Sequence, residues 1–388
     1  MEHDLIIVGG GPVGLALAAA LAPLGRSIAV VERQPRAALA DPAEDGRYIA
    51  LTHRSIGFLQ QVGAWDRIDP ADRSPLREAQ VLNGQSPFAL SFDPGSGGAQ
   101  WLGQLVSNHL IRRALFDTVA AYGNVTLLAD VAVQDVATDR RAARVTLADG
   151  RVLTGQLLAG ADSRFSKVRE ALGIGAEVKR LGRSMLLARV AHEGDHGGIA
   201  TEWFQHGHTI AMLPLNGRRS SAVLTLEDSD VVRVAAMSPA ELGAEITRRY
   251  GHRLGAMQVE AGPHVYPLAV TYAAHFAARR AALLGDAAVG MNPVTAHGFN
   301  LGLQGVASLA GLIGGAGAGA DWGGTLLLRR FEGAHRLATR PIYAATNLLV
   351  GLYGDDSLPA RVMRHATLRA GAHLPLARRA VARMLMQP

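Results

Sequence analysis

The sequence predicts an α/β protein with a parallel sheet, an inserted domain built on a mixed β-sheet, and a helical C-terminus. Three observations support this. The chain opens with an apolar strand, a glycine turn and a small-residue helix. Several strand-like runs follow one another in the middle of the chain, and about the last sixty residues have a helical pattern. A chain of 388 residues is long for one compact unit, so two coupled domains are expected.

A strand–helix–strand unit is predicted at the start of the chain. Residues 4–8 are a short apolar run typical of a buried parallel strand, and residues 9–14 form a turn. Residues 13–24 have the apolar, small-residue character of a packed helix, which Gly25 ends. Residues 28–31 are the next strand, which completes the unit.

Later elements are predicted from the same periodicities. The expected helices are 106–121, one around 241–250, and 299–313. The expected strands are 125–128, 185–190, 209–213, 221–226 and 281–284, and Asp149-Gly150 marks a hairpin turn. The middle region is therefore expected to be rich in sheet with one helix.

The expected domain organisation alternates between two folding units. One unit takes 1–75, 101–180 and 269–345, and the other takes 76–100, an excursion rich in Pro, Gly and Ser, together with the sheet at 181–268. Helices take 346–388.

Composition and charge exclude several classes of protein. The chain has no cysteine, so disulfides, thiolate metal sites and thiol nucleophiles are ruled out, and no spacing of metal ligands stands out. The formal charge of +6 is located at the C-terminus, where residues 361–388 contain six arginines and no acidic residue. The remaining body is formally neutral, so no nucleic-acid partner is expected.

Signals for export or for a membrane span are not expected from the sequence. The N-terminus is acidic rather than basic, and the longest weakly polar stretch, 306–320, is too short and too rich in glycine to cross a bilayer. The expected location is the cytoplasm, with peripheral attachment at the inner face of the membrane as an option. The basic tail would provide that attachment or a contact with a protein partner.

A dinucleotide-binding motif lies in the first strand–helix–strand unit. Residues 9–14 read Gly-Gly-Gly-Pro-Val-Gly and fit G-x-G-x-x-G between a strand and a helix. Gly9 permits the tight turn, Gly11 lets the backbone approach a pyrophosphate, and Gly14 allows close packing of helix on strand. Glu32 ends the next strand, where it can accept hydrogen bonds from a ribose diol. The alternative is a tight turn that binds nothing.

A second constellation, far along the chain, favours FAD over a nicotinamide nucleotide. The apolar run before Gly285-Asp286 is a strand that ends in a carboxylate, and residues 292–302 follow with Asn-Pro and Ala-His-Gly-Phe-Asn-Leu-Gly. Because FAD carries a second polyol, the ribitol, a second carboxylate at a strand end suits it. A helix beginning near Phe299 would point its amides at the flavin and stabilise the reduced, anionic form.

Taken together, four segments resemble a known enzyme family. They are the glycine motif with Glu32-Arg33, residues 45–51, residues 160–169, and Tyr266-Pro267-Leu268 leading to the Gly-Asp segment. The chain resembles the class A FAD-dependent aromatic hydroxylases, which have the para-hydroxybenzoate hydroxylase fold. More narrowly, it resembles hydroxylases of ubiquinone biosynthesis, of the demethoxyubiquinol-hydroxylase type with relaxed choice of ring position.

The resemblance implies that the unit of 1–75, 101–180 and 269–345 is a Rossmann-like FAD-binding domain and that the other unit is the substrate domain. It also implies a set of cofactor-binding residues. Arg47 would lie along the FAD, the backbone of Val131 would contact the adenine, and Asp162 would sit in a motif shared by flavin and nicotinamide binding. Without the resemblance, Arg47 reads as a surface arginine and Asp162 as a helix N-cap. The full set is Gly9, Gly11, Pro12, Gly14, Glu32, Arg33, Arg47, Val131, Asp162, Asp286, Gly298, Phe299 and Asn300.

Two departures from the family pattern are visible. Asp162 is followed by Ser163, where the family usually has glycine, and this could alter nucleotide handling. His297 stands where the family usually has glutamine, which places an imidazole beside the expected flavin site. Pro293 and His297 are the candidate catalytic residues, with the substrate expected near Pro293. A packing or capping role for His297 stays open.

The resemblance also implies the reaction. Reduced flavin would react with O2 to give a C4a-hydroperoxyflavin that hydroxylates an electron-rich ring, with NAD(P)H as the reductant. The expected substrate is a polyprenyl phenol of ubiquinone biosynthesis. The alternatives are a same-fold flavoprotein that acts on a small soluble phenol or as a reductase or dehydrogenase, an enzyme that uses NAD alone, and a non-catalytic binding module. The isolated tryptophans do not form the Trp-x-Trp pair typical of halogenases of this fold.

Overall fold

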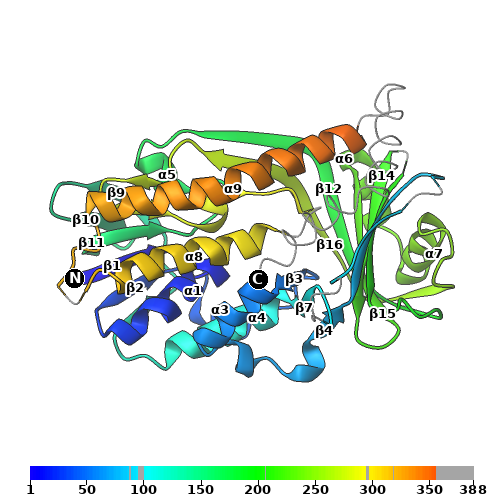
Figure 1. Cartoon of the computed structure of the whole chain (residues 1–388), viewed down its shortest axis with the longest axis horizontal. Coiled ribbons are helices and arrows are strands. Elements are labelled where there is room, and N and C mark those ends of the chain that lie inside the picture. Colours follow the sequence, from blue (N-terminus) through cyan, green and yellow to red (C-terminus); the bar gives the residue numbers. More distant parts are fainter. Residues whose placement is uncertain (87–88, 95–99, 206, 294–296, 318, 355–388) are drawn as a thin grey trace.

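The computed structural model describes residues 1–388 except 87–88, 95–99, 206, 294–296, 318 and 355–388. Figure 1 shows an elongated molecule, with a nucleotide-binding part at one end and a second sheet at the other. The predicted C-terminal helices therefore lie outside the described residues from residue 355 onward.

The first sheet has the order β17-β18-β11-β1-β2-β8. Strands β18, β11, β1, β2 and β8 run parallel, whereas β17 pairs with β18, β10 with β11 and β9 with β10 in the antiparallel sense. β1, β2, β8 and β18 confirm the strands that the sequence predicted here. The strands are β1 (Glu2–Val8), β2 (Ile28–Val31), β8 (Val125–Leu128), β9 (Val133–Thr138), β10 (Ala143–Leu147), β11 (Val152–Gly160), β17 (Ala277–Ala278) and β18 (Ala281–Leu283).

Helices cover this sheet and share one large apolar core with it. Because Gly302 lacks a side chain, helix α8 can approach α1; a Cβ at Gly302 would lie 2.9 Å from Val13. The helices of this part are α1 (Pro12–Leu21), α2 (Arg36–Ala40), α3 (His53–Gln61), α4 (Asn108–Ala120), α5 (Lys167–Ala171), α8 (Gly298–Gly314) and α9 (Thr325–Gly354).

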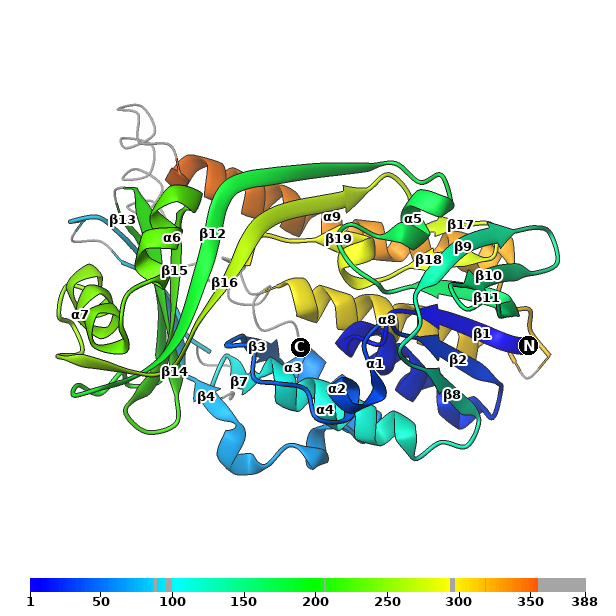
Figure 2. The same ribbon diagram turned by 180° about the vertical axis from the view of Figure 1, so that it is seen from behind.

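The second sheet has the order β19-β16-β12-β15-β14-β13-β5-β6. Two long paired strands, β12 and β16, connect it to the first part of the molecule (Figure 2). Its strands are β5 (Glu78–Asn83), β6 (Leu90–Phe92), β12 (Ala176–His192), β13 (Ile199–Gln205), β14 (His208–Leu215), β15 (Arg219–Glu227), β16 (Met257–Ala273) and β19 (Val289–Gly290). β12 spans the predicted domain boundary at 180/181, and β16 spans the one at 268/269. The division into domains stays a prediction.

Helices α6 (Asp228–Ala235) and α7 (Pro239–Arg249) cover the outer face of this sheet and form a separate apolar core with it. A small third sheet joins β3 (Tyr48–Thr52), β7 (Gly103–Ser107) and β4 (Ser74–Leu76) between the two larger ones. Within the described residues, no helix combines the length and apolar character needed to span a bilayer.

Three sequence predictions of local structure were wrong. The helix predicted from residue 106 begins at Asn108, because the two preceding residues pair as part of β7. The middle region contains two helices rather than one, since α6 was not predicted. The long strand β16 was also missed, because Pro263 and Pro267 interrupt the pattern of a regular strand.

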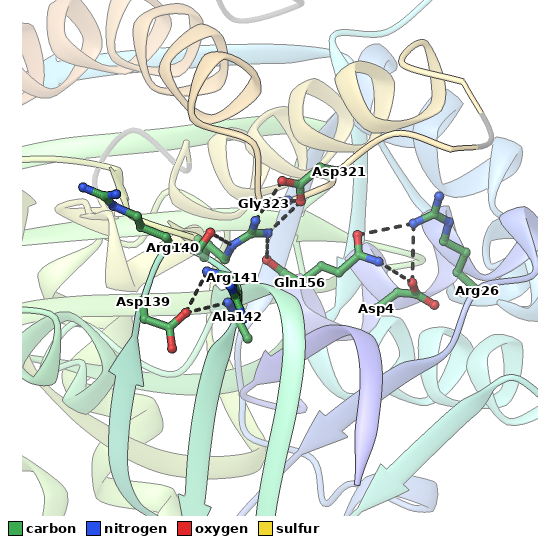
Figure 3. Close-up of polar contacts among 10 residues, drawn as sticks. Asp4, Arg26, Asp139, Arg140, Arg141, Ala142, Gln156, Asp321 and Gly323 are labelled. Atoms are coloured by element: carbon green, nitrogen blue, oxygen red, sulfur yellow. Dashed lines mark hydrogen bonds and ion pairs between the residues drawn. The ribbon is translucent and has the colours of Figure 1, made fainter.

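Polar contacts hold the first sheet together at the end of the strands that lies farthest from the glycine turn (Figure 3). Asp4 accepts a hydrogen bond from Gln156 Nε2 at 3.0 Å and pairs with Arg26 at 3.4 Å. Arg280 binds both carboxylate oxygens of Asp321 at 2.7 and 2.9 Å, which ties β18 to the segment before α9. A ligand of this sheet is therefore expected at the opposite end, beyond the carboxyl ends of the strands.

Candidate active site

The glycine turn joins β1 to α1. Of its glycines Gly9, Gly11 and Gly14, only Gly11 faces open space among the described residues. A Cβ at Gly9 or Gly14 would collide with backbone, with the Ala161 carbonyl oxygen and the Gly9 carbonyl oxygen respectively. Gly9 also has a φ of 112°, which disfavours any other residue. A Cβ at Gly11 would meet no atom of the described part of the chain within 4 Å. Gly11 is the N-cap of α1 and offers no side chain, so the first-turn amides face this open space.

Glu32, at the carboxyl end of β2, closes one side of the turn. One carboxylate oxygen accepts the Gly10 N–H at 2.7 Å and the other accepts the Gln34 N–H at 2.9 Å. The Glu32 carbonyl accepts the Val131 N–H at 3.1 Å, which places Val131 beside the acid. Arg33 is exposed next to them. Three of the predicted residues thus lie together, although Val131 is far from the others in sequence.

The loop before β3 contacts the second sheet. Arg47 binds the Asp45 carboxylate and lies 5.4 Å over the ring of Tyr266, whose hydroxyl donates to the Asp45 carbonyl at 2.8 Å. Asn108 Nδ2 donates to Asp45 at 2.7 Å. Burial alone would raise the pKa of Asp45, but the hydrogen bonds from Arg47 and Asn108 and the Arg47 charge lower it overall. Arg47 is therefore a partly exposed arginine held at the junction of the two sheets.

Arg112 is a member of this group that the sequence analysis missed. It lies on α4, one turn after Asn108, and donates to the Gln34 side chain at 3.1 Å. Burial lowers its pKa, and the charges of Asp45, Arg47 and Glu32 act on it. A cation is therefore placed between the two carboxylates of the site. The spacing of four residues from Asn108 on a predicted helix was the available signal.

Asp162 lies beside the glycine turn, because a Cβ at Gly9 would be 2.9 Å from the Asp162 Cα. Its carboxylate accepts the Ser166 hydroxyl at 2.6 Å and the Lys167 N–H at 2.9 Å. The N-cap of α5 is Ser166, which accepts the Arg169 N–H, so the reading of Asp162 as the N-cap was wrong. Asp162 supports the cap from outside, since the cap position needs a residue one place before the helix.

Asp286 sits in the short turn Gly285–Ala287 at the end of β18. Arg164 donates to one of its oxygens from Nη2 at 2.9 Å and from Nε at 3.2 Å. A Cβ at Gly285 would lie 3.1 Å from Val13, the residue that also touches Gly302 of α8. The Asp286 turn therefore lies against the start of α1. The sequence analysis did not predict Arg164 as its partner.

Helix α8 begins beside β3. Asn300 accepts the Thr52 N–H at 3.1 Å and donates to the Ala50 carbonyl at 2.8 Å, which fixes the helix start on that strand. His297 occupies the N-cap position with only 3% of its surface exposed, and its side chain does not cap the helix. His297 is therefore the N-cap residue by position, without a capping hydrogen bond from its side chain to the helix. Among the described residues, a Cβ at Gly298 would have Met291 nearby, at 3.9 Å, and Phe299 and Pro293 are partly buried.

Comparison with known proteins identifies this arrangement. The family model described as an FAD binding domain matches residues 2–328. The chain belongs to the class A FAD-dependent monooxygenases. A member of this family, the ubiquinone hydroxylase UbiM of Neisseria meningitidis, is 40% identical over 99% of this chain and 85% of its own. The ubiquinone hydroxylase UbiL of Rhodospirillum rubrum is 35% identical over 95% of this chain and 85% of its own.

A solved structure of this class A monooxygenase fold supports the architecture. The p-nitrophenol 4-monooxygenase of Pseudomonas putida superposes with a TM-score of 0.79, covering 99% of this chain and 98% of that one at 17% identity. The fold class and the FAD cofactor predicted from the sequence are confirmed. The chain is an FAD-dependent hydroxylase of a class that uses NAD(P)H, which excludes the NAD-only enzyme and the binding module.

Proposed function

We propose that this enzyme hydroxylates the ring of a polyprenyl phenol or quinol in ubiquinone biosynthesis, with O2 and NAD(P)H as co-substrates. The observation that carries the proposal is the 40% identity to a ubiquinone hydroxylase over 99% of the chain. Apolar side chains from neighbouring strands share the inner face of the second sheet, among them Val81, Ala211 and Val223, and they suit a prenylated ring better than a charged one.

The residues described above fit FAD, and we propose how each group would hold it. The open space at Gly11 and the first-turn amides of α1, beside Gly9, Pro12 and Gly14, would receive the pyrophosphate. Glu32, Arg33 and Val131 would meet the adenosine, and Asp286 the ribitol. Arg47 and Asp162 would flank the cofactor, and Gly298, Phe299 and Asn300 would place the α8 amides at the flavin.

FAD, once reduced by NAD(P)H, supplies the O2 chemistry that places a hydroxyl on the ring. The protein contributes position and exclusion of water. Asn300 holds the α8 start against β3, so the helix dipole points toward the second sheet (Figure 1). Pro293 and His297 precede that start, and we propose that they border the reacting ring. Water is excluded by the apolar residues between β3 and the second sheet.

The function is tested in a bacterial strain that lacks its own ubiquinone ring hydroxylases. Expression of this enzyme should restore ubiquinone, measured by mass spectrometry of lipid extracts, and the accumulated precursor should disappear. Supplied small phenols should stay unmodified. Hydroxylation of small phenols with no change in the quinone pool would instead support the alternative substrate class.

The same strain tests a second part of the proposal, a salt-sensitive contact of the basic tail with an anionic membrane or a protein partner. This part rests on the sequence alone, on the six arginines in 361–388. A chain that ends at residue 371 should keep its FAD but restore less ubiquinone. Full restoration by the shortened chain would show that the tail is dispensable.

We further propose that His297 tunes the flavin or the substrate phenol. An imidazole can change charge near neutral pH and an amide cannot. His297→Gln should retain FAD but change the pH dependence of the ratio of product formed to NAD(P)H consumed. The exposed His275 provides the matched control, His275→Gln. An unchanged ratio at every pH would leave His297 a packing residue.

A further inference from the structure

A carboxylic acid, Glu202, lies on the inner face of the second sheet. It is on β13, between Val81 of β5 and Ala211 of β14 in register. The residues on either side of it in the strand, Thr201 and Trp203, point the other way by alternation. Trp203 packs edge-to-face on Tyr250 at 6.1 Å in the outer core with α6 and α7. Glu202 must therefore face the FAD-binding part.

The strands beside Glu202 present mostly apolar side chains on this face. The row that shares its register across the sheet reads Leu90, Val81, Glu202, Ala211, Val223, Leu187 and His264, so the imidazole in this row is four strands away. Two residues along β13 on the same face, Phe204 lies between Asn83 and Thr209. Two residues along in the other direction, Ala200 belongs to an apolar cluster with Ala50 and Leu102. A lone acid in such a row is costly unless something polar meets it.

No polar partner for Glu202 exists within the described part of the chain. It forms neither a hydrogen bond nor an ion pair there, and burial is the only cause that raises its pKa, to about 8. Glu78 of β5 and His208 of β14 lie on the opposite face by alternation. Arg189 shares the inner face but is three strands away, roughly 14 Å. Among the described residues the acid therefore has no polar partner, and a bound ligand with a hydroxyl group could serve as one.

The inner face borders the place where α8 begins. The Ala50 carbonyl, in the same apolar cluster as Ala200, accepts the hydrogen bond from Asn300 at the helix start. Farther along the face, a Cβ at Gly46 would lie 2.6 Å from His264 and 3.4 Å from Leu187, and Arg189 binds Glu44 at 2.8 Å. The loop of Arg47 and the start of α8 therefore both meet the face that carries Glu202.

We propose that Glu202 is a catalytic residue that binds the phenolic hydroxyl of the substrate and accepts its proton. This rests on the proposed function, in which the substrate is a phenol or quinol. The O–H bond of the phenol breaks, the proton passes to a carboxylate oxygen of Glu202, and the electron pair stays on the phenol oxygen. The ring becomes more electron-rich and therefore more reactive toward an electrophilic oxygen. Glu202 returns the proton to water after the product leaves.

The test compares the wild-type holoenzyme with Glu202→Gln, which keeps the shape of the side chain but cannot accept the proton. Two probes are used with each protein: a phenol with a short prenyl chain and its O-methyl ether, which has no proton to give. The wild type should bind the phenol more tightly than the ether, as followed by the change in flavin absorbance. Glu202→Gln should lose that preference and lower kcat/KM for the phenol by about 100-fold or more, with unchanged FAD content.

The pH profile gives a second, independent readout. In the wild type kcat/KM should rise with pH through about 8 and level off above it, because the carboxylate form of Glu202 becomes the main form once the pH exceeds its pKa. Glu202→Gln should lose this limb. The matched control is Glu227→Gln, an exposed acid on β15 of the same sheet, which should keep both the limb and the preference.

The outcomes separate the two proposals. If the wild type acts only on a small unprenylated phenol, the proposed substrate is wrong, and the same comparison is made with that phenol and its methyl ether. If Glu202→Gln keeps the preference for the phenol and the pH limb with whichever substrate the wild type accepts, Glu202 is not the acceptor. Loss of FAD in Glu202→Gln would also overturn the proposal, because it would show a structural role.

Discussion

Gly11→Trp is expected to leave the protein folded but unable to hold FAD. A Cβ at Gly11 meets no atom of the described residues within 4 Å, so a larger side chain can leave the backbone there without colliding with them. It would fill the space in front of the α1 amides, where the pyrophosphate is proposed to bind. FAD content, measured from flavin absorbance per chain, should fall from about one to nearly zero. Activity with NAD(P)H should fall by at least about 100-fold.

A matched substitution separates the local effect from a general effect of a large aromatic side chain. Gly57 lies on the exposed face of α3, and a Cβ at this position would also meet nothing within 4 Å. Gly57→Trp should keep its FAD and its activity. The circular dichroism spectrum of Gly11→Trp should match that of wild-type protein stripped of FAD. A Gly11→Trp protein that purifies with one FAD per chain would show that the glycine turn is not the phosphate site.

Arg169→Met is expected to destabilise the fold more than any surface change. Arg169 is 6% exposed, and its guanidinium donates to the Ala287 carbonyl at 2.9 Å and to the Arg164 carbonyl at 3.0 Å. Burial lowers its pKa, although the charges of Asp162 and Glu170 act in the other direction. Methionine fills similar space but leaves both carbonyls without this donor. The free energy of unfolding should fall by about 2–4 kcal/mol.

The measurement is urea unfolding of the FAD-free protein, followed by circular dichroism, with Arg329→Met as the exposed control on α9. FAD affinity of Arg169→Met should also weaken, because the Asp286 turn and the Arg164 loop are both held by this one side chain. Stability equal to wild type would contradict the interpretation of Arg169 as the link between these two segments.

Much of the nucleotide-binding half could be predicted from the sequence because its signals are local. β2 and β8 are short apolar runs bounded by polar residues, and their predicted limits agree with the structure. The second sheet was harder to predict. In β16 the prolines break the strand pattern, and the segment is held by its long pairing with β12 rather than by local propensity.

The same distinction applies to the site. The glycine turn, Glu32 and the α8 start were visible as motifs, and the resemblance supplied Val131. Roles for Arg112, Arg164 and Glu202 were not predicted, because the residues that surround each of them in the fold are far away in sequence. Arg164 meets Asp286 across 122 residues. Glu202 reads as an ordinary polar residue of a strand until the sheet order shows which face it occupies.

The start of β12 pairs with the end of β16, so the two ends of the segment that forms most of the second sheet lie side by side. Ala176, the first residue of β12, is paired with Ala273, the last residue of β16. Chain entry and exit are therefore neighbours on adjacent strands, about 5 Å apart. The segment from β12 to β16 therefore leaves the nucleotide-binding part and returns to it at one place. Strands from other parts of the chain join this segment at both sides of the sheet, where β5 pairs with β13 and β19 pairs with β16.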